Sequence, residues 1–196
     1  MTQAQWEQVM GGNPSAHKGA DLPVENVSWY DAVSFCNKLS AKEGLRPAYR
    51  ISGKEATWDE SADGYHLPTA EGNARAVRGR RRRTIPEPTN LLWDAPVGML
   101  ATPEKRTHPV GQKAANAWGL HDMHGNVWEW CWDWYADYGG GSAVDPRGPS
   151  SGLRRVLRGG SWLSVARLCR SASRLGDVAS RAYDYLGFRV VRSSAR

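Results

Sequence analysis

Residues 127–135 alternate strictly between two kinds of side chain. Tryptophan stands at 128, 130, 132 and 134, and the positions between hold Val127, Glu129, Cys131, Asp133 and Tyr135. In an extended strand this spacing of two places the four indoles on one face and the two carboxylates on the other. The pattern predicts a strand that packs an aromatic core on one side and has a polar or ionic role on the other.

A helix is predicted from Ser28 to Gly44. Ser28 is suited to the N-cap, and Asp31 three residues later completes a capping box. Gly44 is typical of a helix end. The apolar positions that follow a helical spacing are Ala32, Phe35, Cys36 and Leu39.

The remaining elements are expected to be short. A second helix should begin after Leu67-Pro-Thr with Thr69 as its cap, and residues 47–66 read as short strands or loop. Strands are predicted at 153–158 and from Leu186, whereas five prolines between 84 and 111 exclude a long element there. One α+β domain spanning 1–196 accounts for this order.

Composition makes the expected core unusual in kind. The chain has ten tryptophans but only two phenylalanines, together with 21 glycines and 11 prolines. Each buried aromatic side chain removes about 150–250 Å² from water. Ten such anchors could hold together a fold with little regular secondary structure and many turns.

Charge and cysteine content limit the function classes. The net charge is +6, and five arginines among residues 78–83 supply most of it. No nucleic-acid motif stands beside them, so a solvated loop is favoured over an anchor for nucleic acid. Three scattered cysteines have neither metal-ligand spacing nor an even count, which indicates a reducing compartment. The absence of a signal peptide or a bilayer-spanning apolar run predicts a cytoplasmic protein without membrane contact.

Five strings occur in an order that resembles the formylglycine-generating enzyme (sulfatase-modifying factor) family. They are Val27-Ser-Trp-Tyr-Asp-Ala-Val, Leu67-Pro-Thr, the run from Asn116 to Trp130, Arg158-Gly-Gly-Ser-Trp and Leu186-Gly-Phe-Arg. The resemblance covers nearly the whole chain and implies a C-type-lectin-like fold with few helices and short antiparallel strands. In relatives a few strands precede the segment that looks like Thr2-Gln-Ala-Gln-Trp. If this chain begins inside a longer protein, display at a surface is compatible with the sequence.

The resemblance also points to a departure from the oxidase branch. There, two cysteines after the Gly-Gly-Ser-aromatic turn bind copper, and paired thiolates suit Cu(I). Here Ser164 follows Trp162 by two residues, and the next cysteine is Cys169. A single thiol cannot form that pair, so oxidase activity is not expected, and Cys169 is more simply a buried structural cysteine.

The segment 163–185 is similar to the variable segment of proteins diversified by retroelements. The shared frame is Gly-Gly-Ser-Trp, then Ala-Arg-x-Cys-Arg-Ser-Ala-x-Arg at 166–174, then Arg181 and Leu-Gly-Phe-Arg. The resemblance implies a ligand surface made by the residues between frame positions, with Trp162 and Tyr183 as aromatic anchors. An ordinary irregular loop is the alternative. The candidate ligand-binding residues are Trp162, Leu163, Ser164, Val165, Leu168, Ser173, Leu175, Gly176, Val178, Ala182 and Tyr183.

Four further positions match a calcium site of the enzyme family: Asp122, Gly125, Val127 and Glu129. Two carboxylates with two backbone carbonyls between them could wrap a Ca²⁺ ion, which takes six to eight oxygen ligands. The expected role is structural. The alternative is that Asp122 and Glu129 form salt bridges or cap backbone amides.

Two functional hypotheses follow. The first is a non-catalytic binding protein whose unknown ligand, a protein or a small molecule, contacts a diversified C-terminal surface. The second is a formylglycine-generating-type copper oxidoreductase that acts on protein cysteine through Cys169. Nucleic-acid binding through the arginines of 78–83 is a weaker third.

Overall fold

The computed structural model describes residues 1–78, 104–137 and 147–192. Its α-helices are α1 (Gln3–Met10), α2 (Trp29–Lys42) and α3 (Ala70–Arg78), and η1 (Ala166–Leu168) is a 3₁₀ turn. The strands are β1 (Tyr49–Ser52), β2 (Glu55–Trp58), β3 (Tyr65–His66), β4 (Trp128–Trp134), β5 (Arg155–Arg158), β6 (Leu175–Asp177), β7 (Leu186–Phe188) and β8 (Val191–Arg192). Short elements joined by long irregular segments confirm the predicted α+β class. In the described residues no helix is long and apolar enough to cross a membrane.

The helix starts follow the capping chemistry of the sequence. Ser28 accepts a hydrogen bond from the Asp31 N–H, and the Asp31 carboxylate accepts one from the Ser28 N–H, so the predicted capping box is present. Thr69 accepts from the Gly72 N–H at the start of α3, as expected. Helix α1 was not predicted, although Thr2 and Gln5 form the same reciprocal box at its start.

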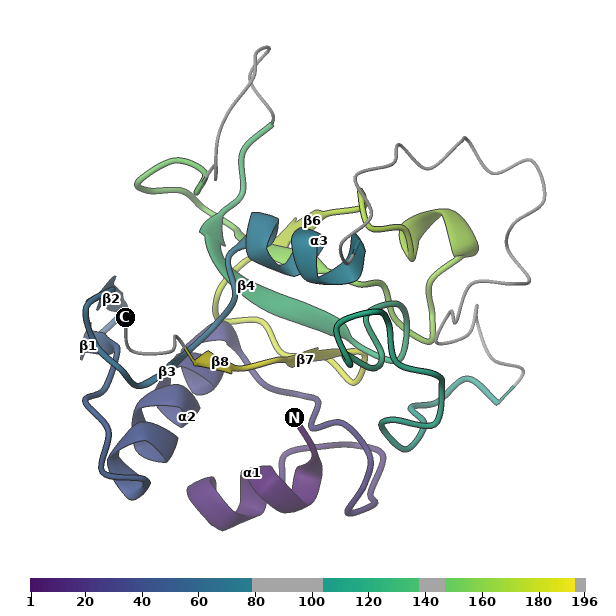
Figure 1. Cartoon of the computed structure of the whole chain (residues 1–196), viewed down its shortest axis with the longest axis horizontal. Coiled ribbons are helices and arrows are strands. Elements are labelled where there is room, and N and C mark those ends of the chain that lie inside the picture. The colour runs from purple at the N-terminus through teal and green to yellow at the C-terminus, as the bar shows by residue number, and fades with distance from the viewer. Residues whose placement is uncertain (79–103, 138–146, 193–196) are drawn as a thin grey trace.

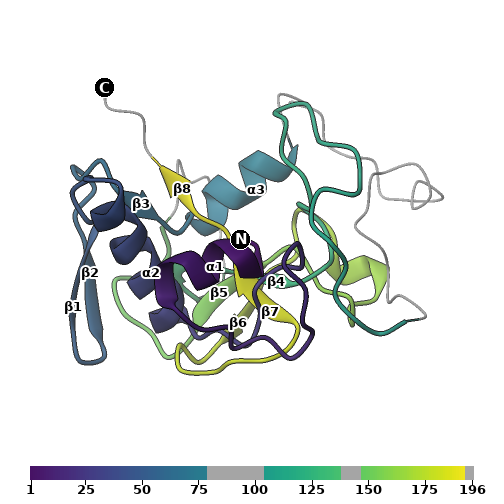
Figure 2. The ribbon, with the colours of Figure 1, turned by 90° about the horizontal axis from the view of Figure 1, so that it is seen from below.

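A four-stranded sheet in the order β6-β5-β4-β7 forms the centre of the molecule (Figure 1). The pairs β4–β5 and β5–β6 are antiparallel, whereas β7 runs parallel to β4 because the chain returns to it by the long segment after β6. Helix α3 lies against β4 and β5 on one face of this sheet, and Figure 2 shows the loop between β6 and β7 on the opposite side. The segment 163–185 therefore begins and ends at strands of one sheet.

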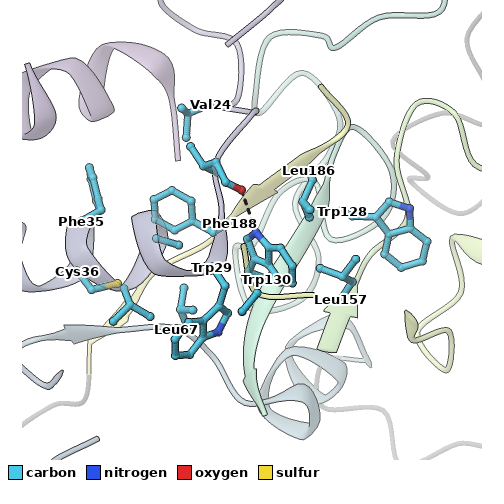
Figure 3. Packing of buried hydrophobic residues seen from close by; sticks show 14 of the residues in the cluster. Val24, Trp29, Phe35, Cys36, Leu67, Trp128, Trp130, Leu157, Leu186 and Phe188 are labelled. Atoms are coloured by element: carbon cyan, nitrogen blue, oxygen red, sulfur yellow. Dashed lines mark hydrogen bonds between the residues drawn. The ribbon is translucent and has the colours of Figure 1, made fainter. Parts of the chain in front are cut away.

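Tryptophans of β4 and α2 dominate the core (Figure 3). The indole N–H of Trp130 donates to the Val27 carbonyl at 3.0 Å, and that of Trp29 donates to the Cys131 carbonyl at 3.0 Å. Each ring thus buries apolar area without leaving its polar atom unpaired. The predicted aromatic face of β4 is confirmed for Trp128 and Trp130, which are buried in the core, and for Trp132, which packs against it.

The other face of β4 is also buried. Glu129, Cys131 and Asp133 all have almost no exposed surface, because α3 and the end of β7 cover them. The Asp133 carboxylate accepts from the Ala70 N–H at 2.5 Å, so it caps α3 from outside the helix. The polar face of the tryptophan strand therefore fastens neighbouring elements together.

Other predictions are met in part. Residues 47–66 contain the β1–β2 hairpin and β3, and the strand expected at 153–158 forms as β5. The arginine cluster lies outside the described residues for 79–83, as does the proline-rich stretch from 84 to 103.

Candidate functional site

The backbone of 163–185 is held by hydrogen-bond donors that lie outside the segment. The donors to its carbonyls are the side chain of Arg158 in β5 and the backbone N–H groups of Trp29 in α2 and Asn26 before α2. The pairs are Arg158 Nη1 to Ser171 O and Ser173 O (3.0 and 2.8 Å), Trp29 N to Ala179 O (3.0 Å) and Asn26 N to Tyr183 O (2.9 Å). Carbonyl oxygens accept these bonds whatever side chain the residue carries. These four hydrogen bonds therefore do not depend on the side chains of the residues that accept them.

Arg158 is the most connected of these donors. The residue is 2% exposed, and its guanidinium also donates to the Ala70 carbonyl from Nε and Nη2 at 3.1 and 3.0 Å. One buried cation thus joins β5, the start of α3 and residues 171–173. Hydrogen bonds from a charged donor are stronger than neutral ones.

The Gly-Gly-Ser-Trp turn fixes the start of the segment. Gly160 has φ +81°, and a Cβ there would lie 2.5 Å from the Cys169 sulfur. The Ser161 N–H donates to Ser164 Oγ at 3.0 Å, which closes the turn from inside. Glycine is required at 160 both by the left-handed backbone and by the thiol packed against it.

Exposure alternates along the residues that follow. Leu163 and Val165 are each 50% exposed and Arg167 is exposed, whereas Ser164 is 4% exposed. Residues 166 and 168 are half-buried. Every second side chain therefore faces solvent while the backbone turns through η1.

Two of the candidate ligand residues are structural. Trp162 is 6% exposed, its Nε1 donates to the Asp184 carbonyl at 3.3 Å, and its ring packs edge-on to His17. This burial disfavours the predicted role of Trp162 as a ligand anchor, and Ser164 is likewise buried. Tyr183 is half-buried and stacks on Tyr185 with ring centroids 5.0 Å apart.

Gly176 is also restricted by packing and cannot be exchanged freely for other residues. A Cβ on Gly176 would lie 2.6 Å from Cγ of Tyr135, so any larger residue would clash with that ring. Leu175 and Val178 beside it are 41% and 44% exposed. The structure thus separates the eleven candidates by exposure. Leu163, Val165, Leu175, Val178 and Ala182 are exposed, Leu168, Ser173 and Tyr183 are half-buried, and Trp162, Ser164 and Gly176 are fixed by packing.

Sequence reasoning missed three surface positions. Arg167, Arg170 and Arg181 were assigned to the invariant frame, but all three side chains are exposed. Among the described residues none of them forms an ion pair, and only Arg170 makes a side-chain hydrogen bond, from Nε to the Arg167 carbonyl at 3.1 Å. Extending the alternation of exposed positions from Leu163 and Val165 by two residues would have identified Arg167 as a surface residue.

A buried acid lies next to His17, the residue whose ring packs against Trp162. Glu25 is fully buried, and its Oε1 accepts from the His17 N–H at 2.8 Å. Its Oε2 and the Nε2 atom of His17 have no hydrogen-bond partner. Burial raises the pKa of the Glu25 carboxyl, because the charged form loses its hydration.

Arg189 links two of the four predicted calcium positions, Asp122 and Glu129, and the oxygens of Glu129 already have donors. Arg189 Nη2 donates to Oε1 at 2.9 Å, Arg189 Nε lies 3.1 Å from both oxygens, and Asn73 Nδ2 donates to Oε2 at 3.1 Å. The adjacent Glu129 carboxylate raises the pKa of Arg189. This guanidinium supplies the positive charge that an ion would bring.

Asp122 is engaged in a similar way. Its Oδ2 accepts from the Gly111 N–H at 2.7 Å, and Arg189 Nη2 donates to the neighbouring His121 carbonyl at 3.0 Å. The described residues contain no group of three or more His, Cys, Asp or Glu side chains placed to hold a metal ion. These contacts match the salt bridge and amide cap weighed against calcium. The donor set at Glu129 does not fit a Ca²⁺ ion as it stands, and calcium at Asp122, Gly125, Val127 and Glu129 stays a prediction from resemblance.

All three cysteines are free and buried. Burial raises the pKa of Cys36, Cys131 and Cys169, which disfavours the thiolate needed for metal binding or nucleophilic attack. Cys169 packs its sulfur against Gly160 inside the turn.

Comparison with known proteins gives the context of this site. A family model described as "Sulfatase-modifying factor enzyme 1-like domain" matches residues 1–194. "Chaperone protein LppX" of Paenibacillus barcinonensis is 35% identical over 98% of this chain and 78% of its own length. The "Formylglycine-generating enzyme" of Thermomonospora curvata is 33% identical over 95% of this chain, which spans only 60% of that enzyme.

Among solved structures, "Treponema denticola variable protein 1" superposes with a TM-score of 0.87. It is 35% identical to this chain, and the match covers 97% of this chain and 81% of that protein. The predicted fold and the predicted likeness to a variable protein are both confirmed.

Proposed function

Given that the chain belongs to the sulfatase-modifying factor enzyme 1-like family, we propose that it is a non-catalytic binding protein whose contact surface is formed by the exposed side chains of 163–185. The surface residues are Leu163, Val165, Leu175, Val178 and Ala182, together with Arg167, Arg170 and Arg181. The likeness to a variable protein supports the further proposal that these positions are diversified.

One observation carries the proposal. The backbone of the segment is anchored by donors from outside it, whereas its exposed side chains make few contacts with the rest of the protein. Side chains can therefore change without removing the hydrogen bonds that hold the loop. Recognition proteins place variable side chains on a rigid frame in the same way.

Catalysis by the oxidase route is the competing function, because a relative of 33% identity bears the name of that enzyme. The buried thiols argue against it, since the pKa of each is raised and Cys169 is enclosed by the Gly160 turn. Oxygen uptake with copper and a cysteine-containing peptide tests this alternative. We expect no turnover, and turnover that Cys169→Ala abolishes would reverse the assignment.

A paired library experiment tests the binding function. One library randomises Leu163, Val165, Leu175, Val178 and Ala182, and a control library randomises exposed positions elsewhere, at Ile51, Leu153 and Val191. Both are displayed and selected against the same two unrelated folded proteins. Specific binders are expected from the first library and not from the second. Equal yields of binders from the two libraries would contradict the proposal that this segment is the contact surface.

Diversification has its own test in the surrounding genomic DNA. We expect a near-copy of the codons for 156–189 that differs mainly at adenines and lies beside a reverse-transcriptase gene. Without such a copy, the segment is an ordinary binding loop.

A further inference from the structure

We infer that the turn 163–170 is a docking surface for a protein partner that presents acidic side chains beside an apolar patch. The inference rests on the proposed binding function and specifies the chemistry of the partner. It depends on four side chains of this turn: Leu163, Val165, Arg167 and Arg170.

The turn is compact and fixed to the body of the protein. The Leu168 N–H donates to the Val165 carbonyl at 2.8 Å, and Ser173 Oγ donates to the Arg167 carbonyl at 2.9 Å. Leu168 packs on the main hydrophobic cluster, and the buried Ser164 and Cys169 close the turn from below. A preorganised surface of this kind loses little conformational entropy when it binds.

The exposed side chains of the turn are of two kinds, aliphatic and basic. Leu163 and Val165 are each half exposed, and these aliphatic side chains gain free energy when a partner covers them. Arg167 and Arg170 carry positive charges with no ion-pair partner among the described residues. Arginine is enriched in interface hot spots because its planar head binds carboxylates through two parallel hydrogen bonds.

A protein fits these groups better than a nucleic acid does. Phosphates would satisfy Arg167 and Arg170, but proteins that bind single strands also stack the bases on aromatic rings. The turn presents Leu163 and Val165 in place of aromatic residues. Two aliphatic side chains followed by two arginines on one turn match an apolar protein surface with carboxylates beside it.

Selection of displayed random peptides on the intact chain tests the inference. The enriched peptides should combine Asp or Glu with large apolar residues. Their affinity should fall at least about tenfold in Arg167→Glu/Arg170→Glu and in Leu163→Ser/Val165→Ser. Leu153 and Arg154 are an exposed leucine–arginine pair outside the segment, so Leu153→Ser/Arg154→Glu is the matched control and should leave affinity unchanged.

The outcomes separate this inference from the function on which it rests. Peptides selected on Arg167→Glu/Arg170→Glu should be enriched in Lys and Arg instead of acids. Binders that map to 163–185 but show no acidic bias overturn the acidic partner and leave the binding function standing. Binders insensitive to every substitution in the segment overturn both. Tighter binding of DNA than of any peptide, lost in Arg167→Glu/Arg170→Glu, would reassign the turn to nucleic acid.

Discussion

Gly176 and Tyr135 are packed so closely that the ring of Tyr135 occupies the space where a side chain on Gly176 would project. A Cβ at 176 would lie 2.6, 2.8 and 2.9 Å from Cγ, Cβ and Cδ2 of Tyr135. Gly176→Ala should therefore destabilise the protein by about 1–3 kcal/mol through overpacking. Denaturant unfolding measures this change.

The neighbouring residue provides the control for that prediction. Leu175→Ala changes an exposed side chain on the same strand and should alter stability by no more than about 0.5 kcal/mol. In a Tyr135→Gly background the cost of Gly176→Ala should shrink, because all three nearest atoms belong to that side chain. An equal cost in both backgrounds would place the strain elsewhere.

Arg158 should be the most sensitive residue beneath the segment. Arg158→Met leaves the carbonyls of Ala70, Ser171 and Ser173 without their charged donor. The expected loss of unfolding free energy is on the order of 3–5 kcal/mol, because hydrogen bonds from charged groups contribute about 1.5–3 kcal/mol each and are not additive. Arg154→Met, at an exposed arginine nearby in sequence, should be close to neutral. Similar losses in the two variants would contradict the role of Arg158 as a clamp.

The Arg189–Glu129 pair predicts independence from divalent ions. Chelation by EDTA should leave the Tm unchanged, because the guanidinium already neutralises the buried carboxylate. Arg189→Ala should cost about 3–5 kcal/mol, since it removes the positive charge paired with the buried Glu129 carboxylate. Arg181→Ala, at an exposed arginine, is the control. If EDTA lowered the Tm and added calcium restored it, the result would support a bound ion at Asp122 and Glu129 and contradict this prediction.

Glu25 predicts a pH dependence of stability. Burial raises the pKa of its carboxyl above the ordinary value of 4.5, so the folded protein binds this proton more tightly than the unfolded chain does. The contribution of Glu25 to stability is then fully present below pH 4.5 and is lost as pH rises through the folded pKa. Lys18 and Asp184 are the charged groups that also act on it.

Glu25→Gln tests this dependence. At pH 7 the variant should be more stable than the parent by on the order of 1 kcal/mol, or about 2–4 °C in Tm, because no buried charge remains without a partner. The two proteins should converge at acidic pH. Glu7→Gln, at an exposed carboxylate, should show no such pH-dependent difference. A difference that stays constant between pH 4 and pH 7 would rule out titration of Glu25.

Local signals in the sequence were sufficient for most of the framework. Ser28 with Asp31 and the alternation of tryptophan in β4 predict their elements correctly, because each signal acts through hydrogen bonds or side-chain direction close by in the chain. The capping box of Thr2 and Gln5 carries the same kind of signal for α1 and was overlooked. The parallel pairing of β7 with β4 could not be derived, since it depends on where a long connection returns.

The site was predictable as a segment but not residue by residue. Trp162 looks like a ligand anchor in sequence, yet the Asp184 carbonyl that pairs with its indole is far along the chain. Gly176 looks variable until Tyr135 is placed against it. Glu129 suits a metal ion until Arg189 is found across from it. Each of these contacts comes from a partner distant in sequence, which local pattern cannot reveal.

A mutational scan of folded abundance across 161–185 tests the central claim most directly. We expect tolerance to alternate with exposure along 163–169. Leu163, Val165 and Arg167 should accept nearly all residue types, whereas Ser164 and Cys169 should accept few. Positions 175 and 178 should tolerate change while 176 does not. If Leu163 and Val165 were as intolerant as Ser164 and Cys169, a fixed backbone carrying replaceable side chains would be wrong.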